Sequence, residues 1–287
     1  MFLLDADTLV SGFPPVQPES PEPLPADYHT HTPLCRHAEG APEEFVDAAI
    51  VAGLSEYGIS DHAPVVPEPF DDWRMAAAEL PEYFSWIDRA RSHAAGRLPI
   101  RAGLECDWLR GCESWIADLS GRYAWDYLIG SVHYLDSWDF DNPKWLARWG
   151  QADVGEVWTH YWREYAAMAD SGLFDILGHP DLVKKFSHFP QGDLDRFYIP
   201  SIEAIKTSGC AVELNTAGWH KPCAEAYPSA RFLALACSAG IPLVISSDAH
   251  HPREVARDFA KAVELAKAVG YRETLLFEGR SRRSEPL

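Results

Sequence analysis

The chain has 287 residues, of which 47% are hydrophobic, so it is long enough to enclose one sizeable core. Its formal net charge of −18 opposes binding to nucleic acid, because that binding depends on Lys and Arg neutralising phosphates. No apolar run reaches the length of a membrane span. The six cysteines include no C-x-x-C pair, which is typical of reduced thiols in a cytoplasmic protein.

Two regions differ in composition. Residues 1–25 are rich in Pro, Glu and Ser and offer little apolar surface, so we expect a leader without a core of its own. Residues 26–287 carry the regular apolar pattern, and at this length a single α/β domain is favoured over two small ones.

From residue 26 onward, segments with a strand pattern alternate with segments of helical periodicity. In chain order we expect strands at 26–29, 56–60, 100–104, 127–131, 174–177, 210–214, 243–245 and 272–277. The helices that we expect between them span 43–51, 79–95, 113–121, 156–171, 193–208, 230–239 and 254–269, with Pro200 interrupting the fifth. A Trp-rich insertion follows the fourth strand, and its Trp138 is a candidate pocket wall. This alternation predicts a parallel sheet covered by helices.

Most of the expected strands lead directly into polar residues that could bind metal or substrate. The carboxyl ends of parallel strands in a closed α/β barrel meet on one face, so residues far apart in sequence could line one cleft. The candidate metal ligands are His29, His31, His37, His62, Glu105, His133, His179, Asp248 and His250. Nitrogen and oxygen ligands without thiolates suit Zn²⁺, Mn²⁺ or Fe²⁺. Clustered ions of this kind can clamp a phosphoryl group and lower the pKa of water.

These residues lie in motifs that resemble those of the PHP (polymerase and histidinol phosphatase) superfamily. The motifs are His29-Thr-His31, Ser60-Asp61-His62, Gly103-Leu-Glu105, Gly130-Ser-Val-His133, Gly178-His-Pro-Asp181 and Ser247-Asp-Ala-His250. Within the superfamily, the chain is most similar to the monofunctional histidinol-phosphatases. The stretches that carry this similarity are His29 to His37, Ser131 to Asp136, Glu213 to Gly218 and Tyr227 to Ser229. The resemblance spans about 26–277.

The resemblance implies a distorted (β/α)₇ TIM-like barrel with three divalent metal ions, either Zn, Mn or Fe. It places His29, His31, Glu105 and Asp248 around one ion. Glu105 would bridge to a second ion held by His133 and His179, and His37, His62 and His250 would hold the third. Glu105, Asp248 and His250 are the predicted catalytic residues.

Substrate contacts are predicted less directly. The family often has an Arg where this chain has His220, before Lys221, so His220 and Lys221 are the candidates for binding phosphate. Glu213 or Asp107 is the candidate for binding a substrate ammonium. Asp61 and Asp181 are expected to orient ligands. Cys35 and Cys106 sit beside ligands, and we expect buried thiols at both positions.

The predicted function is hydrolysis of L-histidinol phosphate in histidine biosynthesis, by a cytoplasmic enzyme whose partner is a small phosphate monoester. Neither nucleic acid nor membrane is expected as a partner, and a homo-oligomer is left open. One alternative is a PHP-type phosphoesterase that acts on another small ester or on a phosphodiester. A non-catalytic metal-binding module is a second alternative. A two-metal amidohydrolase is a third, although that class usually places a Lys where this chain has Glu105.

Overall fold

A computed structural model describes residues 24–287 of the chain. Most of the expected leader, residues 1–25, lies outside the described residues. Leu24 forms a bridge to Leu54, and its N–H donates to the carbonyl of Gly53 at 2.8 Å. Contacts with the body of the protein therefore begin ahead of the boundary expected at residue 26.

Parallel strands form the centre of the molecule. They are β1 (Tyr57–Ile59), β2 (Ile100–Ala102), β3 (Glu105–Asp107), β4 (Ile129–Ser131), β7 (Ile176–Leu177), β8 (Ala211–Asn215) and β9 (Leu243–Ser246). Strands β3, β4, β7, β8 and β9 pair in that order, and β1 pairs with β2.

Isolated bridges close these strands into a barrel. Asp27 bridges to Tyr57 in β1 and to Ile245 in β9, and His62 bridges to Glu105 in β3. Because β2 and β3 are separated only by residues 103–104, they occupy one strand position. With segment 27–30 this gives seven positions, which are 27–30, β1, β2–β3, β4, β7, β8 and β9.

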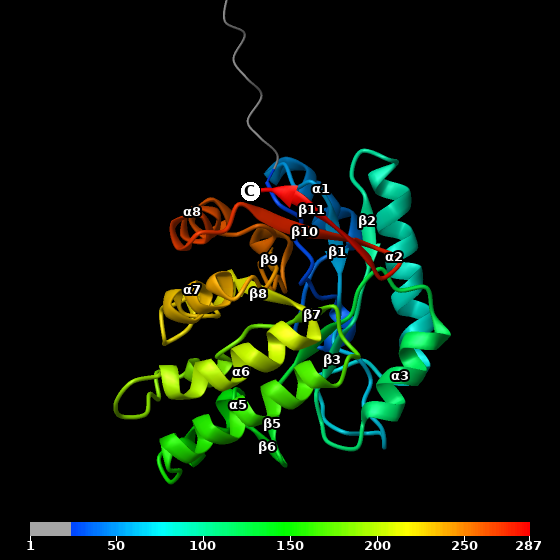
Figure 1. Ribbon diagram of the computed structural model, residues 1–287. Coiled ribbons are helices and arrows are strands. Elements are labelled where there is room, and N and C mark those ends of the chain that lie inside the picture. Colours follow the sequence, from blue (N-terminus) through cyan, green and yellow to red (C-terminus); the bar gives the residue numbers. More distant parts are fainter. Residues whose placement is uncertain (1–23) are drawn as a thin grey trace, which may run out of the picture.

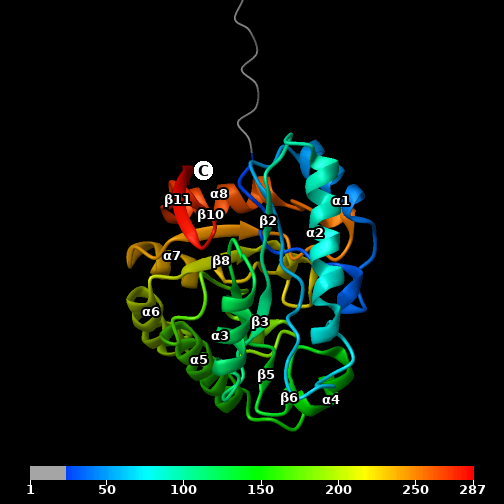
Figure 2. The same cartoon turned by 90° about the vertical axis from the view of Figure 1, so that its right-hand side faces the viewer.

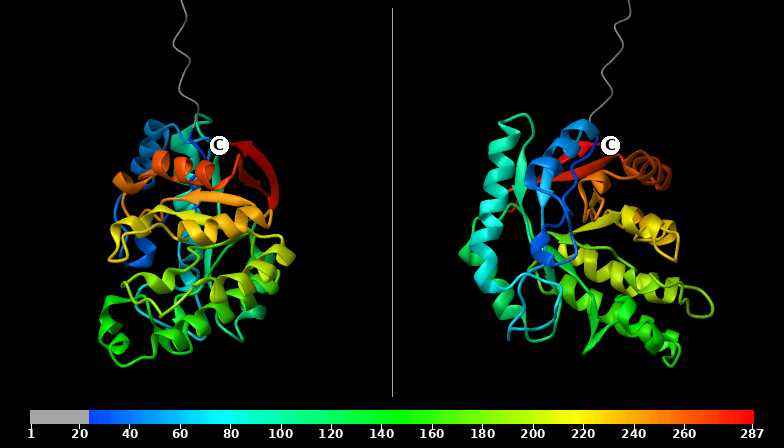
Figure 3. Two further views of the ribbon diagram at one scale, coloured as in Figure 1. Left: turned by 60° about the vertical axis from the view of Figure 1, so that its left-hand side comes forward. Right: turned by 180° about the vertical axis from the view of Figure 1, so that it is seen from behind.

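Helices surround the strands (Figures 1 and 3). They are α1 (Pro42–Ala52), α2 (Leu80–Ala94), α3 (Glu113–Arg122), α4 (Leu146–Trp149), α5 (Val154–Asp170), α6 (Asp195–Ser208), α7 (Ala230–Ser238) and α8 (Phe259–Val269). Short 3₁₀ turns are η1 (Pro33–Cys35), η2 (Ala77–Glu79), η3 (Pro143–Trp145), η4 (Leu182–Lys184), η5 (Thr216–His220) and η6 (Pro252–Glu254). Apart from α4, each helix follows a strand position, as the alternation predicted. None of the helices found in residues 24–287 is both long enough and apolar enough to cross a membrane.

Two helix predictions were wrong in detail. The last long helix begins at Phe259 instead of Glu254, because Ala256 and Asp258 have φ angles of 54° and 62° that no right-handed helix contains. Helix α6 continues through Pro200 without interruption. Pro200 is exposed, so the carbonyl that loses its helical partner can bind water instead.

Two hairpins lie outside the barrel, at opposite ends of the molecule in Figure 2. The first, β5 (Tyr134–Leu135) and β6 (Trp138–Asp139), lies in the Trp-rich insertion close to α4. The second, β10 (Glu273–Glu278) and β11 (Ser281–Pro286), ends the chain. Only β10 was expected from the sequence.

Strand β10 closes the barrel at the end where the strands begin. Its Phe277 belongs to one apolar cluster with Tyr28 and Tyr127, and this cluster also contains the opening residues of β4, β7 and β8. A Cβ on Gly103 would lie 2.3 Å from the Tyr127 ring, so glycine is needed there for Tyr127 to fill the interior. With that end filled, the polar residues gather at the opposite end, where the strands finish.

Candidate metal centre

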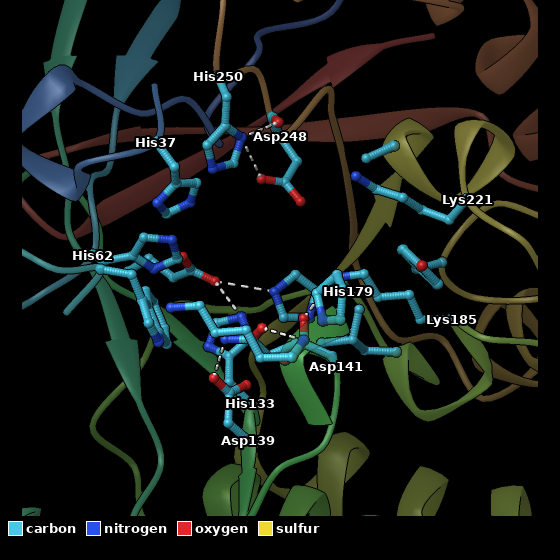
Figure 4. A pocket seen from close by; sticks show the side chains of 18 of the residues that line it. His37, His62, His133, Asp139, Asp141, His179, Lys185, Lys221, Asp248 and His250 are labelled. Carbon is cyan, nitrogen blue, oxygen red and sulfur yellow. Dashed lines mark hydrogen bonds and ion pairs between the residues drawn. The ribbon is translucent and has the colours of Figure 1, made fainter. Parts of the chain in front are cut away.

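All nine candidate ligands lie together at the carboxyl ends of the strands. The segment at 27–30 carries His29 and leads into His31, η1 precedes His37, and β1 leads into His62. Glu105 opens β3, His133 follows β4, His179 follows β7, and β9 leads into Asp248 and His250. Figure 4 shows five of these imidazoles and Asp248 around one cavity. Its volume is about 520 Å³.

Glu105 stands at the centre of the cluster. One of its oxygens, Oε2, lies 2.7 Å from His62 Nδ1 and 3.3 Å from His29 Nε2. The other, Oε1, lies 3.0 Å from His179 Nε2 and 3.6 Å from His133 Nε2. Each oxygen thus faces a different pair of imidazoles, which is the geometry required of a carboxylate that bridges two ions.

Asp248 is the second carboxylate of the cluster, and it faces three imidazoles through one oxygen. Its Oδ1 lies 3.2 Å from His31 Nε2, 3.6 Å from His250 Nδ1 and 3.9 Å from His29 Nε2. One possible ligand group is formed by His29, His31 and Asp248, whose donor atoms lie within 4.8 Å of one another. A second group of the same kind contains His29, Glu105 and His179.

The predicted ligands of the third ion, His37, His62 and His250, lie close to those of the first ion. The His31 ring lies 4.0 Å from that of His250 and 4.3 Å from that of His62, so His31 connects the two regions. His37 stacks on His250 at 4.7 Å. The Cys35 side chain is fully buried, as expected, yet it groups with donor atoms of His37 and His250.

Three buried carboxylates orient the imidazoles from behind. Nδ1 of His29 donates to Glu213 at 2.8 Å, and Nδ1 of His133 donates to Asp107, also at 2.8 Å. A longer contact of 3.4 Å joins His31 Nδ1 to Asp61. Such contacts fix the ring orientation and tautomer, so that Nε2 of each imidazole points into the cluster.

Electrostatics separates the buried imidazoles into two groups. Burial lowers the pKa of His31 and His133, but their carboxylate neighbours outweigh burial and raise the values to about 9 and about 10. The pKa of His29 is also raised well above its usual value by Glu213, Glu105 and Asp248 against burial.

For His62 and His250, burial lowers the pKa well below the usual value, and the positive charge of nearby His31 adds to this effect. Burial opposes ionisation of Glu105 and Asp248, yet the surrounding imidazoles hold both pKa values well below their usual range. Without bound metal, protonated imidazoles supply the positive charge that the two carboxylates require.

Several buried polar atoms of the cluster lack a hydrogen-bond partner. They include His29 Nε2, His62 Nδ1, Glu105 Oε2 and His179 Nδ1. Buried polar groups are rarely left without a partner, and three of these atoms converge, since Glu105 Oε2 faces the other two at His29 and His62. Buried nitrogen and oxygen atoms without a hydrogen-bond partner, imidazoles held in a fixed orientation and ionised carboxylates are the features expected of a site that binds divalent cations.

The outer part of the cavity carries charges of both signs. Lys185 Nζ binds Asp141 at 2.8 Å, and Lys144 Nζ binds Asp72 at 2.9 Å across the mouth. The remaining wall includes Trp73, Leu182, Ala217, Lys221, Tyr227 and Arg257. The cavity therefore offers basic groups close to the cluster and apolar surface beside them.

Some predicted substrate contacts lie elsewhere. Glu213 is fully buried behind His29, and its second oxygen accepts the His179 N–H at 2.6 Å, so it cannot reach a substrate. Asp107 is likewise buried, where it binds Arg74 at 2.6 Å. His220 binds Asp258 at 2.6 Å and is absent from the cavity wall, whereas Lys221 lines it.

Two other predicted positions differ as well. Asp181 binds Lys184 at 3.1 Å and the Ser229 N–H at 2.8 Å, so it joins its own loop to the start of α7 instead of orienting an imidazole. Trp138 packs against Trp149 at 5.0 Å, and Trp73 takes the wall position beside His62.

The sequence reasoning missed several residues of the cavity. Asp139 and Asp141 lie on and after β6, within a stretch that was interpreted only as a Trp-rich insertion. Lys185 follows η4, in the loop after His179. The acidic run Asp136 to Asp141 was a signal, although the hairpin that turns two of these residues inward could not be foreseen.

Comparison with known proteins agrees with the fold and the motifs. The PHP domain model matches residues 27–217, and the chain belongs to the PHP domain family.

Within that family, the chain is similar to histidinol-phosphatases. It is 45% identical over 262 residues to a probable histidinol-phosphatase of Deinococcus radiodurans, covering 91% of this chain and 98% of the relative. The histidinol-phosphatase of Bacillus subtilis is 30% identical over 256 residues, covering 80% of this chain and 94% of the relative.

A solved structure supports the fold independently. The histidinol phosphate phosphatase of Lactococcus lactis, complexed with zinc, L-histidinol and phosphate, matches with a TM-score of 0.73 at 23% identity. The match covers 90% of this chain and 98% of that chain. The predicted distorted TIM-like barrel is thereby confirmed.

Proposed function

We propose that this protein is a metal-dependent phosphatase that hydrolyses L-histidinol phosphate to L-histidinol and phosphate in histidine biosynthesis. The observation that carries the substrate assignment is the 45% identity to a probable histidinol-phosphatase along 98% of that relative. Convergence of the nine candidate ligands at the carboxyl ends of the barrel strands supports the chemistry.

Three divalent ions would be held by residues of the cluster. His29, His31, Glu105 and Asp248 are assigned to one ion, Glu105 with His133 and His179 to the second, and His37, His62 and His250 to the third. Contact of His31 with His62 and His250 supports one continuous trinuclear centre. Zn, Mn and Fe all suit these nitrogen and oxygen donors.

When bound, the ions supply Lewis acidity that polarises the phosphoryl oxygens and activates water. The chain's own residues prepare that chemistry. Glu105 and Asp248 balance the metal charge, and Glu213, Asp61 and Asp107 keep the imidazoles oriented. These fixed groups need no rearrangement during the reaction, which favours electrostatic stabilisation of the transition state.

Basic side chains at the cavity wall would bind the phosphate from the side away from the ions. Lys185, Lys221 and Arg257 line the cavity and bring positive charge into a protein of net charge −18. Together with the bound ions, which would make the cavity positive, these groups would draw a dianionic monoester into the site. The same overall charge, and six free cysteines, support a cytoplasmic enzyme that binds no nucleic acid or membrane.

The assignment is tested by measuring phosphate release from histidinol phosphate, a simple aryl phosphate and a phosphodiester, with metal analysis of the same sample. We expect kcat/KM for histidinol phosphate to exceed that for the aryl phosphate by about 100-fold or more, because polar substrate groups are matched in the site. A chelated sample is the control and should lose activity on every ester. Equal rates on both monoesters would overturn the substrate assignment and leave a general phosphatase.

A further inference from the structure

One carboxylate of the cavity has no basic partner. The cavity is lined by six acidic residues, of which Glu105 and Asp248 face the imidazole cluster. Three more form ion pairs, which are Asp72 with Lys144, Asp141 with Lys185 and Glu254 with Arg257. Within residues 24–287, Asp139 alone among the six makes no ion pair.

Asp139 is also held firmly in place. It ends β6, where it is paired with Tyr134 of β5, and its side chain is only 6% exposed. Its Oδ2 accepts a hydrogen bond from the Asn142 side chain at 2.8 Å, which leaves Oδ1 available to a ligand. Burial and the neighbouring Asp141 raise the pKa of Asp139 to about 7, as expected for a buried carboxylate that lacks a cation.

A buried charge without a partner is costly, and a ligand that supplies the opposite charge removes that cost. The rest of the cavity is suited to the anionic part of such a ligand, because Lys221 and the metal centre attract an anion. Besides its anion-binding groups, the cavity therefore holds one carboxylate that can bind a cation.

We propose that Asp139 binds the ammonium group of the substrate and so selects phosphate monoesters that carry a positively charged amine. This inference rests on the proposed function, in which the ester is histidinol phosphate. It assigns to Asp139 the role that the sequence had suggested for Glu213 or Asp107, both of which are buried in other contacts. Asp139 is then a specificity residue, because it distinguishes substrates without taking part in phosphoryl transfer.

The test compares histidinol phosphate with its des-amino analogue, 3-(imidazol-4-yl)propyl phosphate, in the metal-loaded parent protein and in Asp139→Asn. Both esters release an alkoxide, so any need for protonation of the leaving group is the same for the two. We expect Asp139→Asn to lose about 10- to 100-fold in kcat/KM on histidinol phosphate, mainly through KM, as for a lost hydrogen bond to a charged group. On the des-amino analogue the parent and the variant should agree within about twofold, because this ester has no ammonium group for Asp139 to bind.

Asp136→Asn is the matched control. Asp136 lies in the same hairpin but is 87% exposed, and its φ of 55° is one that Asn tolerates well. This control should match the parent on both esters.

Equal losses on the two esters, or no loss on either, would overturn the role of Asp139 while leaving the phosphatase assignment intact. A misfolded variant would be recognised by loss of activity on the des-amino analogue and by loss of metal. In that case Asp139→Ser, which removes the charge with a smaller side chain, must show the selective loss or the inference fails. If the parent protein does not hydrolyse histidinol phosphate at all, the proposed function itself is contradicted, and the ammonium assignment with it.

Discussion

Replacing Glu105 by Gln tests the bridging role that the geometry gives to this residue. Its two oxygens face different imidazoles, with Oε2 near His62 at 2.7 Å and Oε1 near His179 at 3.0 Å. The side chain is 1% exposed, so water cannot replace a lost contact. Gln has the same shape, but it has one acceptor oxygen in place of two and no charge.

The size of the effect follows from these contacts. A hydrogen bond or ligand contact to a charged group contributes about 1.5–3 kcal/mol, and Gln loses such contacts toward two ions. A loss of about 3–6 kcal/mol corresponds to a fall in kcat of about 10²- to 10⁴-fold. We also expect Glu105→Gln to bind at least one ion fewer, while the barrel stays folded because its apolar packing is unchanged.

The assay combines phosphate release, metal content by mass spectrometry and a thermal unfolding curve on the same preparation. Glu264→Gln is the matched control, because Glu264 is exposed on α8, away from the cavity, and should behave as the parent. Near-parental turnover and full metal content in Glu105→Gln would show that Glu105 does not bridge the ions.

Three further predictions concern the imidazoles. Glu213→Gln should weaken zinc binding or activity by about 10- to 100-fold, because His29 loses the carboxylate behind it; unchanged affinity in a zinc titration would count against that role. His62→Ala should stay folded, retain about two ions and keep weak activity, and three tightly held ions in this variant would contradict the third site. In metal-free protein the pKa of His31 is about 9, because Asp248 and Asp61 outweigh burial, so at neutral pH it is protonated and must release its proton to bind a metal. The pKa of His133 is raised further, to about 10, so zinc affinity should rise with pH up to about 10. Calorimetry in buffers of different ionisation enthalpy should detect proton release, and its absence would refute these shifts.

The ligand residues at the strand ends could be predicted from the sequence, because each lies close in sequence to the apolar segment that forms its strand. Four of the apolar runs reach or are followed within a few residues by His29, His62, His133 or His179, and the carboxyl ends of parallel strands must converge. The parallel sheet with covering helices followed from the same alternation, and the (β/α)₇ barrel was implied by the family resemblance. The ligand positions could therefore be predicted without knowledge of any long-range contact.

The outer cavity could not be predicted, because it depends on contacts between distant segments. In the sequence, Glu213 lies near the end of a predicted strand, where it could face a substrate. In the structure its carboxylate instead accepts a hydrogen bond from His29, 184 residues earlier in the chain. Asp139 faces the cavity only because β6 pairs with β5 in a hairpin of two-residue strands, too short to show a periodic pattern. Ala256 and Asp258 adopt left-handed backbone conformations, but the helical pattern of the sequence continues through both residues. The later start of α8 could therefore not be predicted either.

The most direct test of the metal centre is a titration of metal-free protein with zinc, in which phosphate release from histidinol phosphate is followed against equivalents of metal added. If His29, His31, His37, His62, Glu105, His133, His179, Asp248 and His250 form one trinuclear centre, activity should be absent at the start and reach its plateau at about three equivalents per chain. A plateau at one equivalent, or full activity in the metal-free protein, would contradict it.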